Sequence, residues 1–203
     1  MQLLGRYLSP FVRRTAVTLT LYGMPFESLP LQHTGDDAPR LRELNPLGRV
    51  PALVLDDDTV IIDSAAIIDF ADREVGPERA LTPAGGPERT QVMSFTSAAI
   101  GAAEKAIATV YEKRFRPEEK RHAPWVERCA EQALGGFGYL NGQYEGDWLV
   151  GGRMTQADIT TAVAWQFTGI ANPKLAASLD APKLDQLVER MMQVAAFADT
   201  HPG

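Results

Sequence analysis

The sequence predicts a small α/β domain followed by an all-helical domain, and three observations support this. Short apolar, β-branched segments alternate with helical patterns over residues 1–75. A stretch rich in glycine and proline follows at residues 76–86 and is typical of a linker. Beyond it the strand signals disappear, and apolar residues recur at helical spacing through residues 87–203.

Local signals place the elements of the first domain. Ser9 is a favoured N-cap and Pro10 a favoured first helical residue, which predicts a helix from Pro10 to Tyr22. The acidic run 56–58 predicts a turn between two strands of a hairpin. The pair Asp63-Ser64 predicts the start of another helix. The expected order is strand, helix, strand, helix, strand, strand and helix, at residues 2–7, 10–22, 26–31, 36–44, 52–55, 59–62 and from 63.

This order fits a thioredoxin-like α/β domain. It also allows other small sheets, because strand pairing is not visible in a sequence. In the helical half, Thr155 is expected to cap a helix, with Asp158 reaching back to the Thr155 N–H. Three glycines, at positions 135, 136 and 138, interrupt another helical pattern at ~1 kcal/mol each relative to alanine. That helix therefore either ends early or packs closely against a neighbour.

Composition narrows the classes of function. The 203 residues carry a formal net charge of −6, which argues against a nucleic-acid or anionic-membrane partner. No apolar run approaches the ~20 residues of a membrane span, and the N-terminus lacks the apolar core of a signal peptide. The single cysteine, Cys129, cannot form an internal disulfide and suits a reducing compartment. We expect a cytoplasmic protein without a metal.

A loop of unusual composition, Asn45-Pro46-Leu47-Gly48-Arg49-Val50-Pro51, precedes the expected strand at 52–55. Proline cannot donate to a sheet ladder, so Pro51 belongs at the first residue of a strand or at an edge. Bonds before proline are also the ones for which a cis peptide is readily accessible. Two interpretations follow from the residues alone. A trans Pro51 opens an edge strand, or a cis bend leaves the backbone of Val50 free to pair with an extended peptide.

Four features now stand in one order: the segment Ser9-Pro10-Phe11-Val12-Arg13-Arg14, the loop 45–51, the pair Asp63-Ser64, and the helix start at Thr155. Together they resemble the glutathione S-transferase superfamily, in particular its serine-type bacterial members, over nearly the whole chain. The resemblance implies that the first domain binds glutathione, that the helical domain supplies most of a second-substrate pocket, and that the protein is a homodimer. No cysteine occupies Ser9 or the two following positions, which argues against the cysteine-type members. The maleylacetoacetate isomerase branch usually reads Ser-Ser-Cys where this chain reads Ser-Pro-Phe.

The resemblance also assigns roles to single residues. Ser9 would donate a hydrogen bond to the glutathione sulfur and stabilise its thiolate. Val50, on a cis Pro51, would offer its backbone to the cysteinyl part of glutathione. Asp63 would bind the γ-glutamyl amine, and Ser64 the γ-glutamyl carboxylate.

The remaining assignments leave alternatives open. Phe11, His33 and Arg49 would line the glutathione site, although an exposed loop histidine and a surface arginine explain the last two equally well. Arg14 matches an arginine frequent in the family and is expected to be structural. Candidates for the second-substrate pocket are Tyr7, Tyr111, Arg114 and Trp165. Packing or surface positions explain the last three of these equally well.

The activity implied is glutathione transfer, a detoxification chemistry in which the thiolate attacks a small, largely apolar electrophile. Lowering a thiol pKa of about 8.5 by about two pH units takes ~2.7 kcal/mol. One hydrogen bond to a charged group supplies ~1.5–3 kcal/mol and a helix N-terminus ~0.3–1 kcal/mol. Two alternatives are a non-catalytic relative that binds a partner or ligands, and a glutathione-dependent isomerase, dehalogenase or peroxidase. Non-catalytic relatives often lose the serine or the acid–serine pair, and this chain has both.

Overall fold

The chain forms two compact units in the computed structural model, which describes residues 1–202. Unit 1 comprises Met1–Ala84 together with Met192–Gly203, and unit 2 comprises Gly85–Met191. The boundary between Ala84 of unit 1 and Gly85 of unit 2 falls within the expected linker at 76–86. The C-terminal segment, expected within the helical domain, groups instead with unit 1.

A four-stranded mixed sheet forms the centre of unit 1. Its strands are β1 (Gln2–Leu4), β2 (Glu27–Leu29), β3 (Ala52–Val54) and β4 (Val60–Ile62). The order across the sheet is β2-β1-β3-β4. β1 pairs in parallel with β2 and antiparallel with β3, and β3 forms an antiparallel hairpin with β4. The predicted strand–helix–strand unit followed by a hairpin is therefore confirmed.

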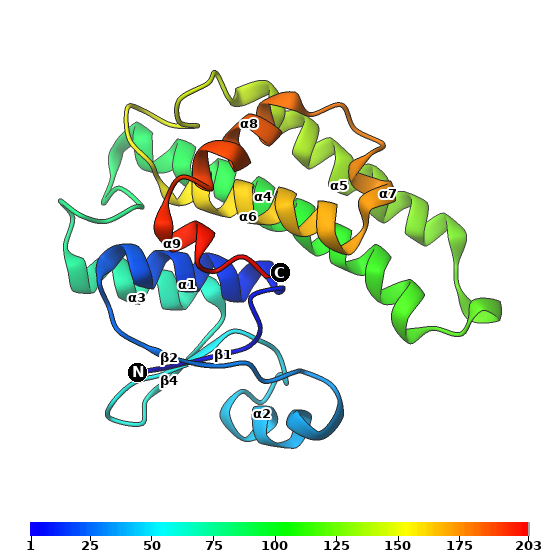
Figure 1. Ribbon diagram of the computed structural model, residues 1–203, viewed down its shortest axis with the longest axis horizontal. Coiled ribbons are helices and arrows are strands. Elements are labelled where there is room, and N and C mark those ends of the chain that lie inside the picture. The colour runs from blue at the N-terminus through cyan, green and yellow to red at the C-terminus, as the bar shows by residue number, and fades with distance from the viewer. Residues whose placement is uncertain (203) are drawn as a thin grey trace. The chain divides into compact units, whose positions relative to one another are not determined.

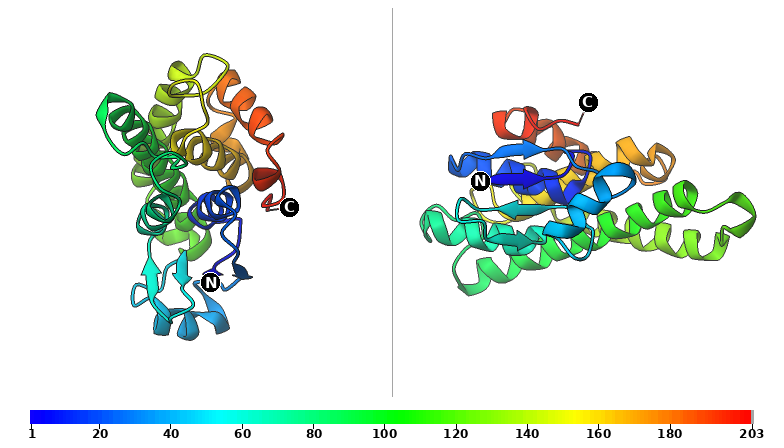
Figure 2. Two further views of the ribbon diagram at one scale, coloured as in Figure 1. Left: turned by 90° about the vertical axis from the view of Figure 1, so that its left-hand side faces the viewer. Right: turned by 90° about the horizontal axis from the view of Figure 1, so that it is seen from below.

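Helices cover both faces of this sheet. They are α1 (Pro10–Tyr22), α2 (Ala38–Leu44) and α3 (Ser64–Val75). The short C-terminal α9 (Ala195–Ala198) packs against α1. Because side chains alternate along a strand, Leu4 and Ala52 share one face, where they pack with Leu41 of α2. The buried cross-strand pair Leu3 and Leu53 points to the other face. There α1 and α3 lie side by side (Figure 1), and Figure 2 shows α2 on the opposite side of the sheet from α1.

The C-terminal segment joins unit 1 through Arg13 of α1. The Arg13 Nη2 donates to the carbonyl of Phe197 at 3.0 Å, and its guanidinium lies 4.1 Å from the centre of the Phe197 ring. Both side chains are buried. Burial lowers the pKa of Arg13 to about 10. This contact accounts for the difference from the expected domain division, because it ties the end of the chain to a helix of the first unit.

Tyr22 links the end of α1 to α3 and to the segment that follows α3. Its hydroxyl donates to the carboxylate of Asp72 and accepts a hydrogen bond from the backbone N–H of Leu81 at 2.6 Å. Tyr22→Phe would leave the buried Leu81 N–H without its acceptor. We therefore expect this variant to lower the free energy of unfolding by about 2 kcal/mol in urea denaturation. Tyr139→Phe, at a half-exposed position of unit 2, should change it by less than ~0.5 kcal/mol. Equal stability of the two variants would contradict the assigned role of the Tyr22 hydroxyl.

Unit 2 is built from helices. They are α4 (Gly86–Phe115), α5 (Ala123–Gln143), α6 (Gln156–Ala171), α7 (Pro173–Ala176) and α8 (Pro182–Met191). The long helices α4 and α5 form a hairpin, and α6 packs along α4 (Figure 1). α5 runs on through Gly135, Gly136 and Gly138, and a Cβ on Gly136 would lie only 3.0 Å from the Cβ of Ala102 in α4. Close packing is therefore the reason for glycine there. None of the helices described within residues 1–202 has the length and apolar character needed to cross a membrane.

The predicted start of α6 is confirmed as a capping box. Asp158 Oδ2 accepts from the backbone N–H and the hydroxyl of Thr155, both at 2.8 Å. Asp158 Oδ1 also accepts from the backbone N–H of Leu149 at 2.7 Å. Burial raises the pKa of the Asp158 carboxyl, while its hydrogen bonds from Leu149 and Thr155 act in the opposite direction. One buried carboxylate thus joins α6 to the loop that precedes it.

Candidate functional site

The loop before β3 is shaped by the side chain of Asn45. Asn45 is buried, its Nδ2 donates to the carbonyl of Arg49 at 2.7 Å, and its Oδ1 accepts from the N–H of Leu47 at 3.0 Å. The peptide bond between Val50 and Pro51 is cis, which decides between the two interpretations of this loop. Within residues 1–202, neither the N–H nor the C=O of Val50 makes a hydrogen bond. The loop therefore presents one unpaired backbone donor and one unpaired acceptor.

Gly5 brings the turn before α1 against this loop. Its φ of +119° lies in the region that favours glycine, and a Cβ there would lie 2.5 Å from Val12 Cγ2 and 2.9 Å from Val50 Cβ. Its N–H donates to the carbonyl of Leu29 at 2.8 Å. Any side chain at position 5 would push α1 and the Val50 loop apart. Gly5 was not predicted as a site residue, and its only signal in the sequence was a glycine inside the strand predicted at residues 2–7.

Ser9 lies half-buried at the N-terminus of α1. Its Oγ accepts from the N–H of Val12 at the long distance of 3.5 Å, and its own N–H donates to the carbonyl of Arg6 at 3.0 Å. A hydroxyl that accepts a hydrogen bond still has its proton to donate. Ser9 can therefore cap its helix and also donate to an atom outside the protein.

The start of α3 brings Asp63, Ser64 and Arg14 together. Asp63 has a φ of +72°, and its Oδ1 accepts from the N–H of Ala65 at 2.8 Å. Ser64 is only 3% exposed, and its Oγ accepts from Nη1 of Arg14 at 3.2 Å. The first turn of a helix carries free N–H groups and a partial positive charge. With a guanidinium against Ser64, this helix start favours an anionic ligand.

Arg14 is buried, so water screens its charge little and the charge acts strongly on neighbouring groups. Burial lowers the pKa of Arg14 to about 10, while the negative charges of Asp63 and Asp72 act to raise it. The group therefore stays charged at neutral pH. Its Nε is buried and has no hydrogen-bond partner in the part of the chain that the structure describes. Arg14 was expected to be structural, and its contact with Ser64 is compatible with that role.

The remaining predicted site residues of unit 1 are Phe11, Tyr7, His33 and Arg49. Phe11 is half-buried and its carbonyl accepts from the Thr15 hydroxyl at 2.9 Å. Tyr7 and His33 are also half-buried, whereas Arg49 is exposed and contacts Asn45 through its carbonyl. Among residues 1–202, no group of three or more His, Cys, Asp or Glu side chains is arranged to hold a metal ion.

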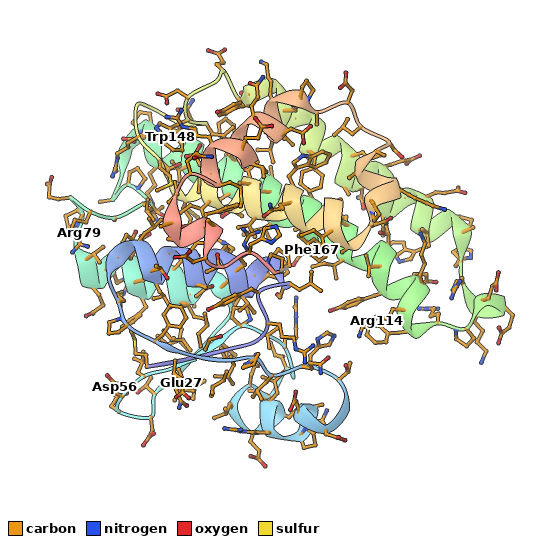
Figure 3. All side chains as sticks on the ribbon, viewed as in Figure 1. Glu27, Asp56, Arg79, Arg114, Trp148 and Phe167 are labelled. Carbon is orange, nitrogen blue, oxygen red and sulfur yellow. The ribbon has the colours of Figure 1, made fainter. Side chains whose placement is uncertain are left out.

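In unit 2, two of the three predicted pocket residues lie on α4 at the surface, and the third lies on α6 in the core. Trp165 lies in the helical core, edge-on to Phe137 at 5.1 Å, and its Nε1 donates to Asp185 at 2.7 Å. Tyr111 is 42% exposed. Arg114 lies on the last turns of α4 (Figure 3) and is exposed. Tyr111 and Arg114 thus lie at the surface, whereas Trp165 does not.

Family models for the two domains of one enzyme superfamily match this chain. The glutathione S-transferase N-terminal domain matches residues 8–74, and the glutathione S-transferase C-terminal domain matches residues 102–194. The chain belongs to the glutathione S-transferase family. The small mixed sheet followed by a helical domain is the fold of glutathione S-transferase structures, as predicted.

Several glutathione S-transferase relatives align over the full length. The GST-like protein YibF of Escherichia coli is 28% identical and covers 100% of this chain and 98% of its own length. Maleylacetoacetate isomerase of Pseudomonas aeruginosa is 26% identical, covering 100% of this chain and 96% of its own. The crystal structure of a glutathione S-transferase from Methylobacillus flagellatus with glutathione bound has a TM-score of 0.91. It is 25% identical and covers 100% of this chain and 99% of its own.

Proposed function

We propose that this protein is a serine-type glutathione transferase that conjugates glutathione to a small, largely apolar electrophile. The observation that carries the proposal is the unpaired backbone N–H and C=O of Val50, which Gly5 holds against the start of α1. An extended peptide that pairs with this backbone would lie beside the start of α1, where Ser9 is the N-cap. The similar structure that contains glutathione supports this tripeptide as the ligand.

Each part of glutathione has a partner in this arrangement. The cysteinyl backbone pairs with Val50, as in strand addition. The γ-glutamyl carboxylate binds Ser64 and the free N–H groups at the start of α3, and its amine binds Asp63. Phe11, His33 and Arg49 line the rest of the site.

Ser9 carries the chemical step. Its hydroxyl donates to the glutathione sulfur, which favours the thiolate over the thiol. The thiolate then attacks the electrophilic carbon, a C–S bond forms, and the leaving group departs with its electron pair. Tyr7, Tyr111 and Arg114 remain the candidates for contact with the electrophile, and Trp165 is the weakest because it lies in the core.

Calorimetric titration with glutathione, followed by turnover of an activated aryl chloride, tests the proposal. We expect saturable binding, and release of one chloride for each thiol consumed. Failure of glutathione to bind at millimolar concentration would overturn the assignment. Binding without turnover of any electrophile would instead indicate a non-catalytic relative.

A glutathione-dependent isomerase is the second candidate, because the full-length similarity to maleylacetoacetate isomerase favours it. The reading Ser9-Pro10-Phe11 in place of Ser-Ser-Cys stands against it. The two reactions differ in the fate of the thiol. An isomerase adds glutathione to a conjugated double bond and releases it again, so the free thiol count stays constant, whereas a transferase lowers it. A thiol assay during turnover of unsaturated carbonyl compounds therefore separates them.

Two adjacent arginines of α1 offer a matched pair of variants. Arg14→Met removes the charge against Ser64, and we expect about ten-fold weaker glutathione binding. Arg13→Met removes the contact with Phe197 but none with Ser64, so it should lower Tm and leave the affinity for glutathione unchanged. Calorimetry and thermal denaturation measure both. Parallel losses of affinity and Tm in the two variants would show that Arg14 is only structural.

A further inference from the structure

Two contacts join α1 to α3 at matching positions. The Nη1 of Arg14 donates to Ser64 Oγ at 3.2 Å, and the hydroxyl of Tyr22 donates to the carboxylate of Asp72. The contacts are eight residues apart on each helix, from 14 to 22 on α1 and from 64 to 72 on α3, which is just over two helical turns. They therefore follow one another along the interface of the two helices, which run side by side in Figure 1.

The first of these contacts involves a buried charge that is balanced only at longer range. Arg14 is 3% exposed and makes no ion pair with any residue in the range 1–202. Burial lowers the pKa of Arg14 to about 10, and the negative charges of Asp63 and Asp72 oppose this. In the proposed function Asp63 binds the amine of the ligand, so Asp72 remains as the counter-charge that the protein itself supplies.

Tyr22 holds the Asp72 carboxylate in place. Its hydroxyl donates to this carboxylate and also accepts from the N–H of Leu81 at 2.6 Å. The carbonyl of Tyr22 accepts from Nη2 of Arg79 at 3.0 Å, and its side chain is buried. Because the hydroxyl and the backbone of Tyr22 are both bonded to the segment 79–81, Asp72 has a stationary hydrogen-bond donor.

The separation between Asp72 and Arg14 matters for the binding of an anion. A carboxylate in direct contact with a guanidinium uses the N–H groups that a ligand carboxylate would need. A carboxylate at longer range still opposes the cost of burying the charge, but it leaves those N–H groups available. The Nε of Arg14 has no hydrogen-bond partner within residues 1–202. The guanidinium is thus kept charged beside Ser64 with a donor to spare.

We propose that Tyr22 and Asp72 are positioning residues for the γ-glutamyl carboxylate of glutathione. Tyr22 keeps the Asp72 carboxylate from pairing with Arg14, and the guanidinium is left to Ser64 and the ligand. The inference rests on the proposed function, because it concerns the same glutathione site, and it adds two residues that act through Arg14. It also makes the site depend on the segment 79–81, which holds Tyr22.

Calorimetric titration of two variants with glutathione tests the proposal. Tyr22→Phe frees the Asp72 carboxylate to pair with Arg14, so glutathione should bind about five-fold more weakly. Asp72→Asn keeps an acceptor for Tyr22 but removes the negative charge, so the ligand anion should bind about three-fold more tightly. Thermal denaturation should show a loss of stability in both, because one leaves the Leu81 N–H without its acceptor and the other a buried cation without its counter-charge. A merely structural pair would instead shift the two affinities in the same direction.

The gain in Asp72→Asn should depend on the ligand carboxylate. A glutathione analogue whose γ-glutamyl carboxylate is an amide should bind this variant no more tightly than the wild type. Asp69→Asn is the matched control for charge, since Asp69 is exposed on the same helix and pairs with Arg73 at 2.8 Å. It should retain wild-type affinity for glutathione.

The outcomes separate this proposal from the proposed function. Unchanged or parallel affinities in Tyr22→Phe and Asp72→Asn, or an equal gain in Asp69→Asn, would overturn the roles of Tyr22 and Asp72. Saturable binding to the wild type in the same titrations would leave the glutathione site itself intact. Failure of the wild type to bind glutathione would overturn both.

Discussion

Ser9→Ala should raise the pKa of the bound glutathione thiol by about two pH units, toward its free value. The hydroxyl of Ser9 accepts a long hydrogen bond from Val12 and keeps its own proton, which it can donate to the sulfur. Removing that donor takes away ~1.5–3 kcal/mol of thiolate stabilisation. Ultraviolet absorbance of the thiolate, recorded against pH with the protein saturated in glutathione, measures the change.

Ser9→Gly separates this effect from helix capping. Glycine is nearly as good an N-cap as serine, whereas alanine costs ~1 kcal/mol of stability. Both variants should show the raised thiol pKa, but only Ser9→Ala should lose stability. A titration curve unchanged in both would remove Ser9 from its proposed role while leaving the rest of the site intact.

Asp158→Ala should lower the free energy of unfolding by about 3–5 kcal/mol, the largest effect on stability that we expect. The variant leaves the N–H of Leu149 and the N–H and hydroxyl of Thr155 without their acceptor in a buried region. It also removes the link between α6 and the preceding loop. Chemical denaturation measures the loss.

Asp147→Ala is the matched control for this carboxylate. Asp147 is exposed and pairs with the half-exposed Arg190 at 2.6 Å, so its removal should cost no more than ~1 kcal/mol. Asp158→Asn keeps one acceptor oxygen and should fall between the two. If Asp158→Ala were no less stable than Asp147→Ala, the capping box would not be the main support of α6.

Elements whose signals are local could be predicted from the sequence. Ser9 and Pro10 mark the start of α1, and Gly23, at φ +68°, stops it at the expected residue. The capping box could also be predicted, because its two polar residues, Thr155 and Asp158, lie three positions apart in the sequence. The first strand was predicted too long, to residue 7. It ends at Leu4 because Gly5 turns the chain to meet Val12 and Val50, which depends on tertiary packing.

The same distinction applies to the candidate site. The helix starts at Ser9 and at Asp63-Ser64 were predicted from local signals, whereas the roles of these residues toward glutathione came from the family resemblance and stay predictions. The contact of Arg14 with Ser64 joins residues 50 positions apart, and that of Arg13 with Phe197 joins residues 184 apart. No local pattern contains such pairs. Trp165 was expected at a pocket but lies in the core, because a helical pattern does not tell which neighbour covers a given face.

The most direct test of glutathione binding at the Val50 loop is an amide chemical-shift titration of the isotope-labelled protein. On addition of glutathione, we predict that the Val50 N–H moves downfield as its missing hydrogen bond forms, and that the Ser64 N–H shifts at the same ligand concentration. Saturable binding that leaves the amides of Val50 and Ser64 unmoved would contradict the account.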